Sequence, residues 1–353
     1  MSSEKSTIVR ADTRADLSAR AAKLRPLFGT LERMAPRVGA RLAWRLWSTP
    51  TPPSAKAVAR SREGGMGDVR RMRIELPDWT GRRPTRRDGT MKPKRTVQIV
   101  VELLGPEDGP LVYLLHGWAG WRGQFSPLGR RLAADGYRVV LVEAPNHGDS
   151  GPGALGGKQS LLPDFSLVLA EVIRRFGPAY AVVGHSLGAA CTATVLLDGT
   201  KAERAVFLAP PIDPVAFTRV LAGMLGFGER IRTRMVGTGE RRIGIRLASF
   251  ILPPRLVGRT DLPAALIVHD TDDPVVSVLG GRKLAESWPR GRIVETAGLG
   301  HNKILRDEDV IELVAAFIDG EEINSGRRGR DEVYVESGLP ADHGPRRVTP
   351  QST

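Results

Sequence analysis

From residue 111 onward, short continuous apolar runs alternate with amphipathic stretches. The runs are LVYLL, YRVVLVEA, YAVVG, RAVFLA, ALIVH and RIVETA, which begin at residues 111, 137, 180, 204, 265 and 292. Helical periodicity appears near 125–134 and 164–176, and again at 307–318. Uninterrupted apolar strands separated by helices are typical of a sheet that is covered on both faces. The pattern therefore predicts an α/β fold with a mostly parallel central sheet and helices on both faces.

The regular alternation is absent in two regions. Residues 210–261 carry helical stripes without a clear strand, which predicts a helical cap inserted over one end of the sheet. Residues 21–47 show a rough helical stripe that Pro36 interrupts, and the proline-rich STPTPPS at 48–54 ends it. Residues 71–76 and 96–104 are predicted to pair as a hairpin.

These patterns predict four segments along the chain. They are a disordered N-terminus over 1–20, a basic extension over 21–95, a core over 96–320 that contains the cap, and a polar, disordered tail over 321–353.

The net charge of +13 is concentrated at the start of the chain. Residues 1–95 contain 23 Lys and Arg against 9 Asp and Glu, whereas the remainder contains 29 against 30. The simplest interpretation is a solvated arm whose apolar stripe packs on the body of the protein. The alternatives are contact with an anionic membrane surface, aided by Trp44, Leu46 and Trp47, or binding of another polyanion such as nucleic acid.

Cysteine content and apolar run lengths argue against several classes of protein. The single cysteine, Cys191, has no partner for a disulfide, and the six histidines are too dispersed to suggest a metal site. The first twenty residues lack the apolar core of a secretory signal. The longest apolar stretch, 179–197, divides into a strand and a helix better than it spans a bilayer. We predict a cytoplasmic protein without a transmembrane segment, metal or cofactor.

The stretch VVGHSLGAAC, residues 182–191, carries the strongest chemical signal. Ser186 directly follows an apolar strand and precedes a helix of small residues. A nucleophile on such a tight turn needs neighbours without bulky side chains, and Gly184 and Gly188 meet this need. The start of the following helix would direct amide donors and a positive dipole end toward an anionic intermediate.

A serine hydroxyl needs a base, and the base needs a carboxylate to orient it. HDTDDPVV supplies Asp270, Asp272 and Asp273 after one strand, and GLGHNKIL supplies His301 after the next. The order serine, aspartate, histidine is the one expected for this arrangement, although the residues alone leave the choice among the three aspartates open.

The stretch LVYLLHGWAG predicts a site for an oxyanion. A strand ends there at His116 and Gly117, and the chain turns with its backbone amides facing outward. The amides of Trp118 and Leu187 are the candidate donors. His116, His147 and His185 are predicted to pack or form hydrogen bonds around the turn rather than to ionise in turnover.

Together, LLHGWAG, EAPNHGDSG, VVGHSLGAA and the HDTDDPVV and GLGHNKIL pair resemble the α/β-hydrolase superfamily, in its serine-dependent esterase, lipase and thioesterase branch. The resemblance covers about residues 96–320. It implies Ser186 as nucleophile, His301 as base and Asp273 as acid, and it implies that the cap shapes an acyl pocket. Ser277 departs from the family pattern, where proline is frequent at that position, and residues 1–95 match no part of the common core.

The function predicted on this basis is hydrolysis of a carboxylic ester or thioester through an acyl-enzyme, and lactones remain possible substrates. Related haloalkane dehalogenases and epoxide hydrolases carry an aspartate at the strand-to-helix turn, or elbow, where this chain has Ser186. A serine at that position favours acyl transfer. Apolar cap residues suggest a hydrophobic acyl group: Phe217, Leu221, Leu225, Phe227, Phe250, Ile251 and Leu252. The alternative is a non-catalytic binding module of the same fold that acts through its basic N-terminal arm.

Overall fold

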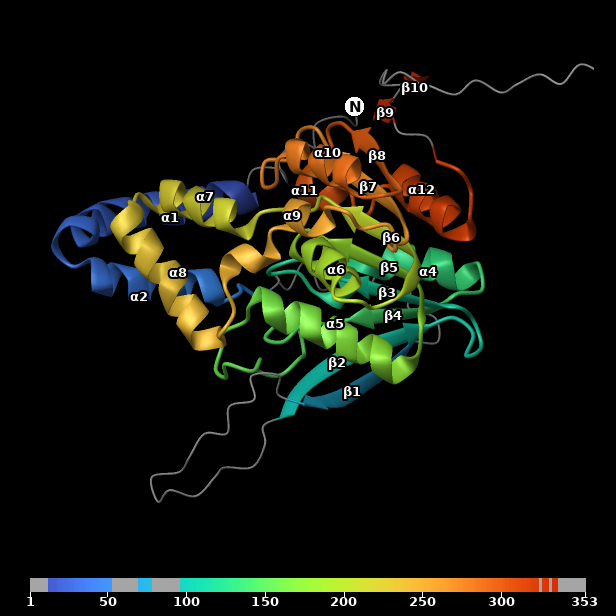
Figure 1. The fold of residues 1–353 in the computed structure, drawn as a ribbon, viewed down its shortest axis with the longest axis horizontal. Helices are drawn as coiled ribbons and strands as arrows, with labels where there is room; N and C mark the ends of the chain where they lie inside the picture. The colour runs from blue at the N-terminus through green and yellow to red at the C-terminus, as the bar shows by residue number, and fades with distance from the viewer. Residues whose placement is uncertain (1–11, 53–68, 78–95, 324–325, 330–331, 336–353) are drawn as a thin grey trace, which may run out of the picture.

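The central element of the fold is a twisted sheet in the order β1-β2-β4-β3-β5-β6-β7-β8-β9-β10 (Figure 1). The computed structural model describes residues 12–52, 69–77, 96–323, 326–329 and 332–335. The strands from β3 to β9 run parallel, and β1, β2 and β10 pair antiparallel. The first eight strands are β1 (Arg70–Pro77), β2 (Thr96–Leu104), β3 (Leu111–Leu115), β4 (Arg138–Val142), β5 (Ala179–His185), β6 (Ala202–Leu208), β7 (Ala264–Asp270) and β8 (Gly291–Thr296).

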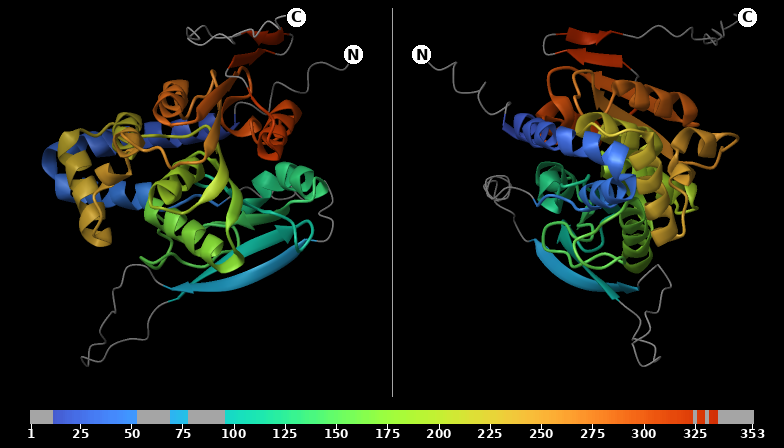
Figure 2. Two further views of the ribbon diagram at one scale, coloured as in Figure 1. Left: turned by 45° about the vertical axis from the view of Figure 1, so that its right-hand side comes forward. Right: turned by 90° about the vertical axis from the view of Figure 1, so that its left-hand side faces the viewer.

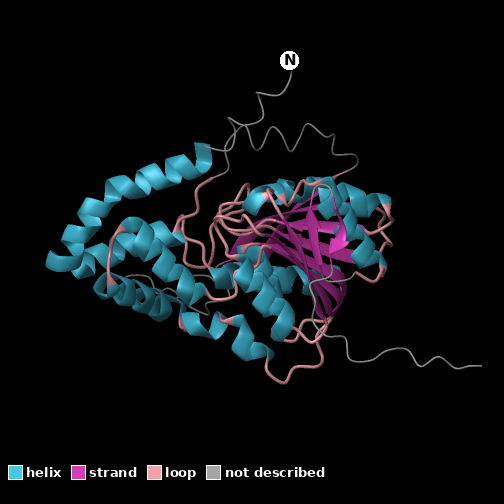
Figure 3. Ribbon diagram, turned by 90° about the horizontal axis from the view of Figure 1, so that it is seen from above, coloured by secondary structure: helices cyan, strands magenta, loops and turns pink. Residues whose placement is uncertain are grey.

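Helices cover both faces of this sheet, as the apolar strand pattern predicts (Figure 3). On one face, α4 (Ser126–Ala134) and α12 (Glu308–Asp319) bury Leu128, Leu132 and Val314 against the strands. The other face is covered by α5 (Leu162–Phe176), α6 (Leu187–Leu197) and α10 (Val278–Ser287). Short helices η2 (Arg122–Phe125) and α11 (Gly300–Lys303) follow β3 and β8. The predicted α/β architecture is confirmed.

The cap insertion is helical, as predicted, and consists of α7 (Pro214–Leu225), α8 (Glu229–Ile243), η3 (Leu247–Phe250) and α9 (Leu252–Leu256). It is joined by α1 (Asp12–Met34) and α2 (Pro36–Ser48), which pack against α7 and α8 respectively (Figures 1 and 2). Phe28 of α1 lies against Phe227, with ring centroids 5.1 Å apart. The apolar stripe of the N-terminal segment therefore packs, but on the cap rather than on the sheet.

Several predicted boundaries need correction. Helix α1 begins at Asp12, within a segment predicted to be disordered, because the stretch RADLSARAA at 14–22 is rich in strong helix formers. Within the predicted tail, β9 (Gly326–Gly329) and β10 (Glu332–Val335) form strands, and the β-prone sequence VYV at 333–335 accounts for the second. The predicted hairpin pairs Ile74 with Ile99, while its connection, 78–95, lies outside the described residues.

Candidate active site

The side chains of Ser186, His301 and Asp273 form one hydrogen-bonded chain. The Ser186 hydroxyl donates to His301 Nε2 at 2.9 Å, and His301 Nδ1 donates to Asp273 Oδ2 at 2.7 Å. These residues come from the end of β5, from α11 and from the loop after β7, all at the carboxyl edge of the parallel sheet. Ligand sites of open α/β sheets occur at this edge. The structure thus brings the three candidate residues together although up to 115 positions separate them.

A sharp turn places Ser186 at this edge. Its backbone has φ 52° and ψ −125°, a conformation that costs a non-glycine residue free energy. The Ser186 amide donates to the carbonyl of Leu208 at 2.8 Å, which fixes the turn against β6. A Cβ at Gly184 would lie 2.5 Å from the Gly188 carbonyl oxygen, and one at Gly188 would lie 2.3 Å from that of Leu115. Both glycines are therefore required by close backbone packing.

The three aspartates after β7 have different partners. Buried Asp270 accepts from the Asp272 amide, the Thr296 hydroxyl and the Leu299 amide, so it holds the loops together. Exposed Asp272 accepts from the Gly298 amide. Of these carboxylates, Asp273 is the one that reaches the imidazole of His301.

The carboxylate of Asp273 is held in its ionised form. Burial alone would raise its pKa, but hydrogen bonds from His269, His301 and the Val276 amide outweigh burial and lower that pKa. His269 Nε2 lies 3.0 Å from the carbonyl oxygen of Val276 and 3.5 Å from Asp273 Oδ2. His269 therefore helps to hold the loop of Asp273 and Val276, a contact that sequence reasoning missed. The only signal was its position four residues before Asp273, at the end of an apolar strand.

The histidines around the turn stay neutral, in agreement with the prediction from sequence. Burial lowers the pKa of His185 to about 3, and its Nε2 donates to the carbonyl of His301 at 2.8 Å. Burial lowers the pKa of His147 to about 4, and burial also lowers that of His116. His116 accepts from the Ala144 amide and His147 from the Ala119 amide, both at 3.1 Å. These rings bridge the loops that follow β3 and β4.

A buried ion-pair network ties the same two loops together. Arg122 contacts Glu143 at 2.5 Å, Glu102 at 2.7 Å and Asp149 at 3.2 Å. The side chains of Arg122, Glu102 and Glu143 are almost fully buried, so the pairing offsets a large desolvation cost. The network links β2, η2 and the loop after β4 behind the turn of residues 116–119.

That turn lies directly against the Ser186 elbow. A Cβ built on Gly117 would come within 2.8 Å of the Ser186 Cβ, so the strand-end loop and the elbow are in close contact. Within the described part of the chain, the Trp118 amide donates to no other residue. Leu187 is the first residue of α6, where the N–H groups of a helix have no intrahelical partner.

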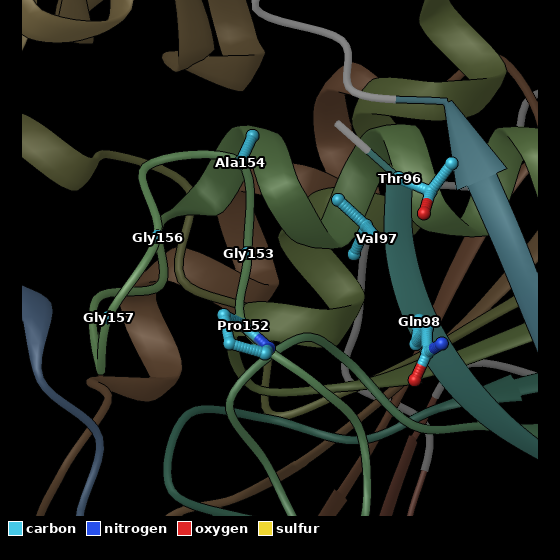
Figure 4. A pocket seen from close by; sticks show the side chains of 8 residues that line it. All are labelled: Thr96, Val97, Gln98, Pro152, Gly153, Ala154, Gly156 and Gly157. Carbon is cyan, nitrogen blue, oxygen red and sulfur yellow. The ribbon is translucent and has the colours of Figure 1, made fainter. Parts of the chain in front are cut away.

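A cavity of about 370 Å³ lies at the same edge of the sheet but apart from the three candidate residues (Figure 4). It lies between the first residues of β2 and the glycine-rich loop after β4, and Ser186, His301 and Asp273 do not line it. Among the residues that the structure describes, no group of three His, Cys, Asp or Glu could hold a metal ion. Nor is any helix among them long and apolar enough to cross a membrane.

Comparison with known proteins agrees with this architecture. Residues 112–316, more than half of the chain, match the alpha/beta hydrolase family, and the chain belongs to that family. The chain is 18% identical to a hydrolase of known structure from Pseudomonas aeruginosa PA01, with a TM-score of 0.50 over 72% of this chain and 99% of that one. At this identity the likeness shows the fold.

Two curated relatives match shorter stretches. The Magnesium-chelatase 30 kDa subunit of Rhodobacter capsulatus is 32% identical over 40% of this chain and 51% of its own length. The Pimeloyl-[acyl-carrier protein] methyl ester esterase of Xanthomonas oryzae pv. oryzae is 42% identical over 23% of this chain and 28% of its own length. The chain therefore spans about half or less of the length of these relatives.

Proposed function

We propose that the protein is a serine hydrolase that cleaves a carboxylic ester or thioester. The observation that carries the proposal is the continuous hydrogen-bonded chain from Ser186 through His301 to Asp273. The arrangement has the geometry in which a base removes the hydroxyl proton and a buried carboxylate supports the resulting imidazolium.

In the proposed reaction, Ser186 Oγ attacks the substrate carbonyl carbon while its proton passes to His301 Nε2. The tetrahedral intermediate collapses as His301 returns that proton to the leaving alcohol or thiol, which leaves an acyl group on Ser186. Water then attacks the acyl-enzyme, with His301 again acting as base, and the carboxylic acid is released. The reaction requires no metal or cofactor.

The amides of Trp118 and Leu187 are the proposed donors to the oxyanion. They belong to the loop and the helix start that meet at the elbow, and the dipole of α6 also favours negative charge there. His116 and His147 support this loop from behind through the amides of Ala144 and Ala119.

The cap provides fewer candidate pocket residues than the sequence suggests. Leu225, Phe227, Phe250 and Leu252 are buried, and three of them pack within the cap core or against the sheet helices. Phe217, Leu221 and Ile251 are half-buried and remain candidates for contact with a hydrophobic acyl group. An ester substrate is in keeping with the methyl ester esterase named among the relatives.

A cytoplasmic location forms part of the proposal, and it is based on the cysteine content: Cys191 is the single cysteine of the sequence, so the chain holds no second cysteine for a disulfide. This side chain is buried, and burial raises its pKa to about 12, so it remains a protonated thiol in the core.

The test compares wild type, Ser186→Ala and Ser249→Ala on p-nitrophenyl esters from acetate to decanoate. Ser249 is exposed, lies in η3 of the cap and is remote in sequence from Ser186, so it serves as a serine control for the nucleophile. We expect Ser186→Ala to lose at least about 1000-fold in kcat/KM, because the nucleophile is gone, and Ser249→Ala to retain wild-type rates. Circular dichroism checks that all three proteins fold.

Labelling by a fluorophosphonate probe distinguishes two reasons for a lack of ester hydrolysis: an inactive Ser186 and an unsuitable ester substrate. Wild type should react, with an Oγ–P bond formed and fluoride released, while Ser186→Ala should not. Hydrolysis by Ser186→Ala at the wild-type rate would contradict the proposal. So would a wild type that neither turns over an ester nor takes the label, which would favour a non-catalytic binding module.

A further inference from the structure

Four helices that pack together, α1, α2, α7 and α8, carry a large surplus of positive charge. Residues 22–48 of α1 and α2 and residues 214–243 of α7 and α8 together contain 12 Lys and Arg against 3 Glu. We call these two segments the cap pole. The cap pole carries a surplus of nine positive charges, and the net charge of the whole chain is +13. The sequence places most of the basicity in residues 1–95, and the fold brings the arginines of α7 and α8 next to the arginines of α1 and α2.

The outer face of α2 combines arginines with apolar side chains. Arg37, Arg41 and Arg45 follow at four-residue intervals, so they form one exposed stripe along the helix. Val38, Leu42 and Leu46 repeat the same interval, and Val38 and Leu46 are the exposed members of this neighbouring row, while Leu42 packs partly against the cap core. Val38 is 53% exposed and Leu46 is 41% exposed, while Met34 at the end of α1 is 80% exposed. Trp44, in contrast, faces the cap core and is buried, so it takes no part in this face.

The three arginines of α2 lack carboxylate partners among the described residues. Several other surface arginines do have such partners: Arg174 pairs with Glu171, Arg259 with Asp261 and Arg282 with Glu295. The single acidic residue of the segment 22–48, Glu32, instead accepts from the amides of Arg230 and Ile231 at the start of α8. The positive charge of the α2 face is therefore not neutralised within the described structure.

We propose that the outer face of α2 docks on an anionic lipid surface. A stripe of arginines beside a stripe of exposed aliphatic side chains is the pattern of a helix that lies in the membrane interface, with arginines on headgroups and apolar side chains at the acyl boundary. A nucleic acid would complement the charge but not the apolar stripe, and the buried Trp44 offers no stacking surface. The proposal goes beyond the hydrolase function and does not depend on it.

Vesicle sedimentation tests the docking with the full chain. The probes are phosphatidylcholine vesicles with and without phosphatidylglycerol as about one third of the lipid, at about 0.05 M and about 0.5 M salt. Wild type should sediment with the anionic vesicles at low salt and remain in solution with the neutral ones. The triple variant Arg37→Gln, Arg41→Gln, Arg45→Gln should bind roughly a hundredfold more weakly, because each arginine contributes about fivefold.

Two further variants make the test specific. The matched control Arg73→Gln, Arg175→Gln, Arg292→Gln removes the same charge from exposed positions outside the cap pole and should bind like wild type. Val38→Ser with Leu46→Ser keeps the charge and should weaken binding several-fold, because the apolar stripe is lost. Circular dichroism monitors folding, and Ser186→Ala should sediment like wild type, which keeps this result separate from catalysis.

Three outcomes would overturn the proposal. The first is a wild-type protein that does not sediment with anionic vesicles at low salt. The second is equal binding by the α2 triple variant and the control variant. The third is a wild type that binds a DNA duplex or a purified acidic acyl carrier protein while it leaves vesicles in solution, since the face would then belong to that partner.

Discussion

Asp273 differs from its two neighbours in the partner that its side chain reaches. Asp270 and Asp272 accept backbone and hydroxyl hydrogen bonds, whereas Asp273 lies 2.7 Å from His301 Nδ1. Two backbone amides, of Val275 and Val276, donate to its other oxygen and hold the carboxylate in place. The loop geometry thus favours Asp273, among three aspartates that are similar in sequence, for the proposed role of acid.

This assignment predicts unequal effects of two conservative substitutions. Asp273→Asn should lower kcat by about 1000-fold or more, because the amide cannot support the imidazolium or hold the required tautomer. Asp272→Asn, at an exposed position, should retain activity within a few-fold. Ester hydrolysis and thermal unfolding of both variants check this. Equal losses in the two would point to a general disturbance of the loop rather than to a role of Asp273.

The chain order of the site residues could be predicted from local sequence, because a tight turn imposes small neighbours on Ser186 and each partner follows a strand. The supporting residues could not be predicted in this way. His185 reaches the carbonyl of His301 across 116 positions, and Arg122 meets Glu102 and Glu143 from three separate elements. Such partners depend on how strands stack in the sheet, which periodicity does not specify.

At the scale of elements, α2 and α8 approach each other closely because each presents a glycine to the other. A Cβ on Gly39 would lie 2.3 Å from Ile231 Cδ1, and one on Gly239 would lie 2.3 Å from Trp44 Cζ3. The buried rings and aliphatic groups of the cap core fill the space that these glycines leave. The insertion and the N-terminal segment thus form one packed unit.

Two glycines of α8 should therefore respond in opposite ways to alanine. Gly239→Ala should destabilise the protein by about 1–3 kcal/mol, because the rigid Trp44 ring would have to move. Gly237→Ala would meet only the flexible end of Arg241, and should stabilise by about 0.5–1 kcal/mol through helix propensity. Urea unfolding measures both. A neutral Gly239→Ala would show that α2 and α8 do not depend on this contact.

At the scale of the molecule, the buried histidines make stability depend on pH. His116, His147 and His185 are neutral in the folded protein because burial lowers each pKa below the ordinary value of 6.5. The unfolded chain binds protons at these rings below about pH 6.5, and the folded chain does not. Stability is therefore complete above that pH and declines as the pH falls toward the folded pKa values.

We expect the free energy of unfolding to fall below pH 6.5 by about 1 kcal/mol per pH unit for each histidine. Urea unfolding at pH 7.5, 6 and 5 measures the slope. His147→Gln, which retains an acceptor for the Ala119 amide, should be less stable at pH 7.5 but have a shallower slope. Equal stability of wild type at pH 7.5 and 5 would contradict this account.

The distribution of charge shows what the linear sequence conceals. Counting residues along the chain predicts a basic arm and a neutral body, because the arginines of α7 and α8 are averaged with acidic residues elsewhere. In the folded chain, the arginines of α8 lie next to those of α1. For example, the guanidinium of Arg230 donates to the backbone carbonyls of Glu32 and Arg33. The fold class could be predicted from hydrophobic periodicity. The distribution of charge on the surface could not, because it depends on packing between helices that are distant in sequence.

The shared cap also imposes an order of assembly during synthesis. Arg25 of α1 donates to the carbonyl of Gly223, which lies 198 positions later in the chain. At a synthesis rate of about 5 to 20 residues per second, α1 emerges from the ribosome roughly 10 to 40 seconds before its partner helices do. Throughout that interval, the apolar side of the nascent α1–α2 hairpin has no docking surface of its own chain. The α1–α2 hairpin therefore cannot complete its packing until α7 and α8 have been synthesised.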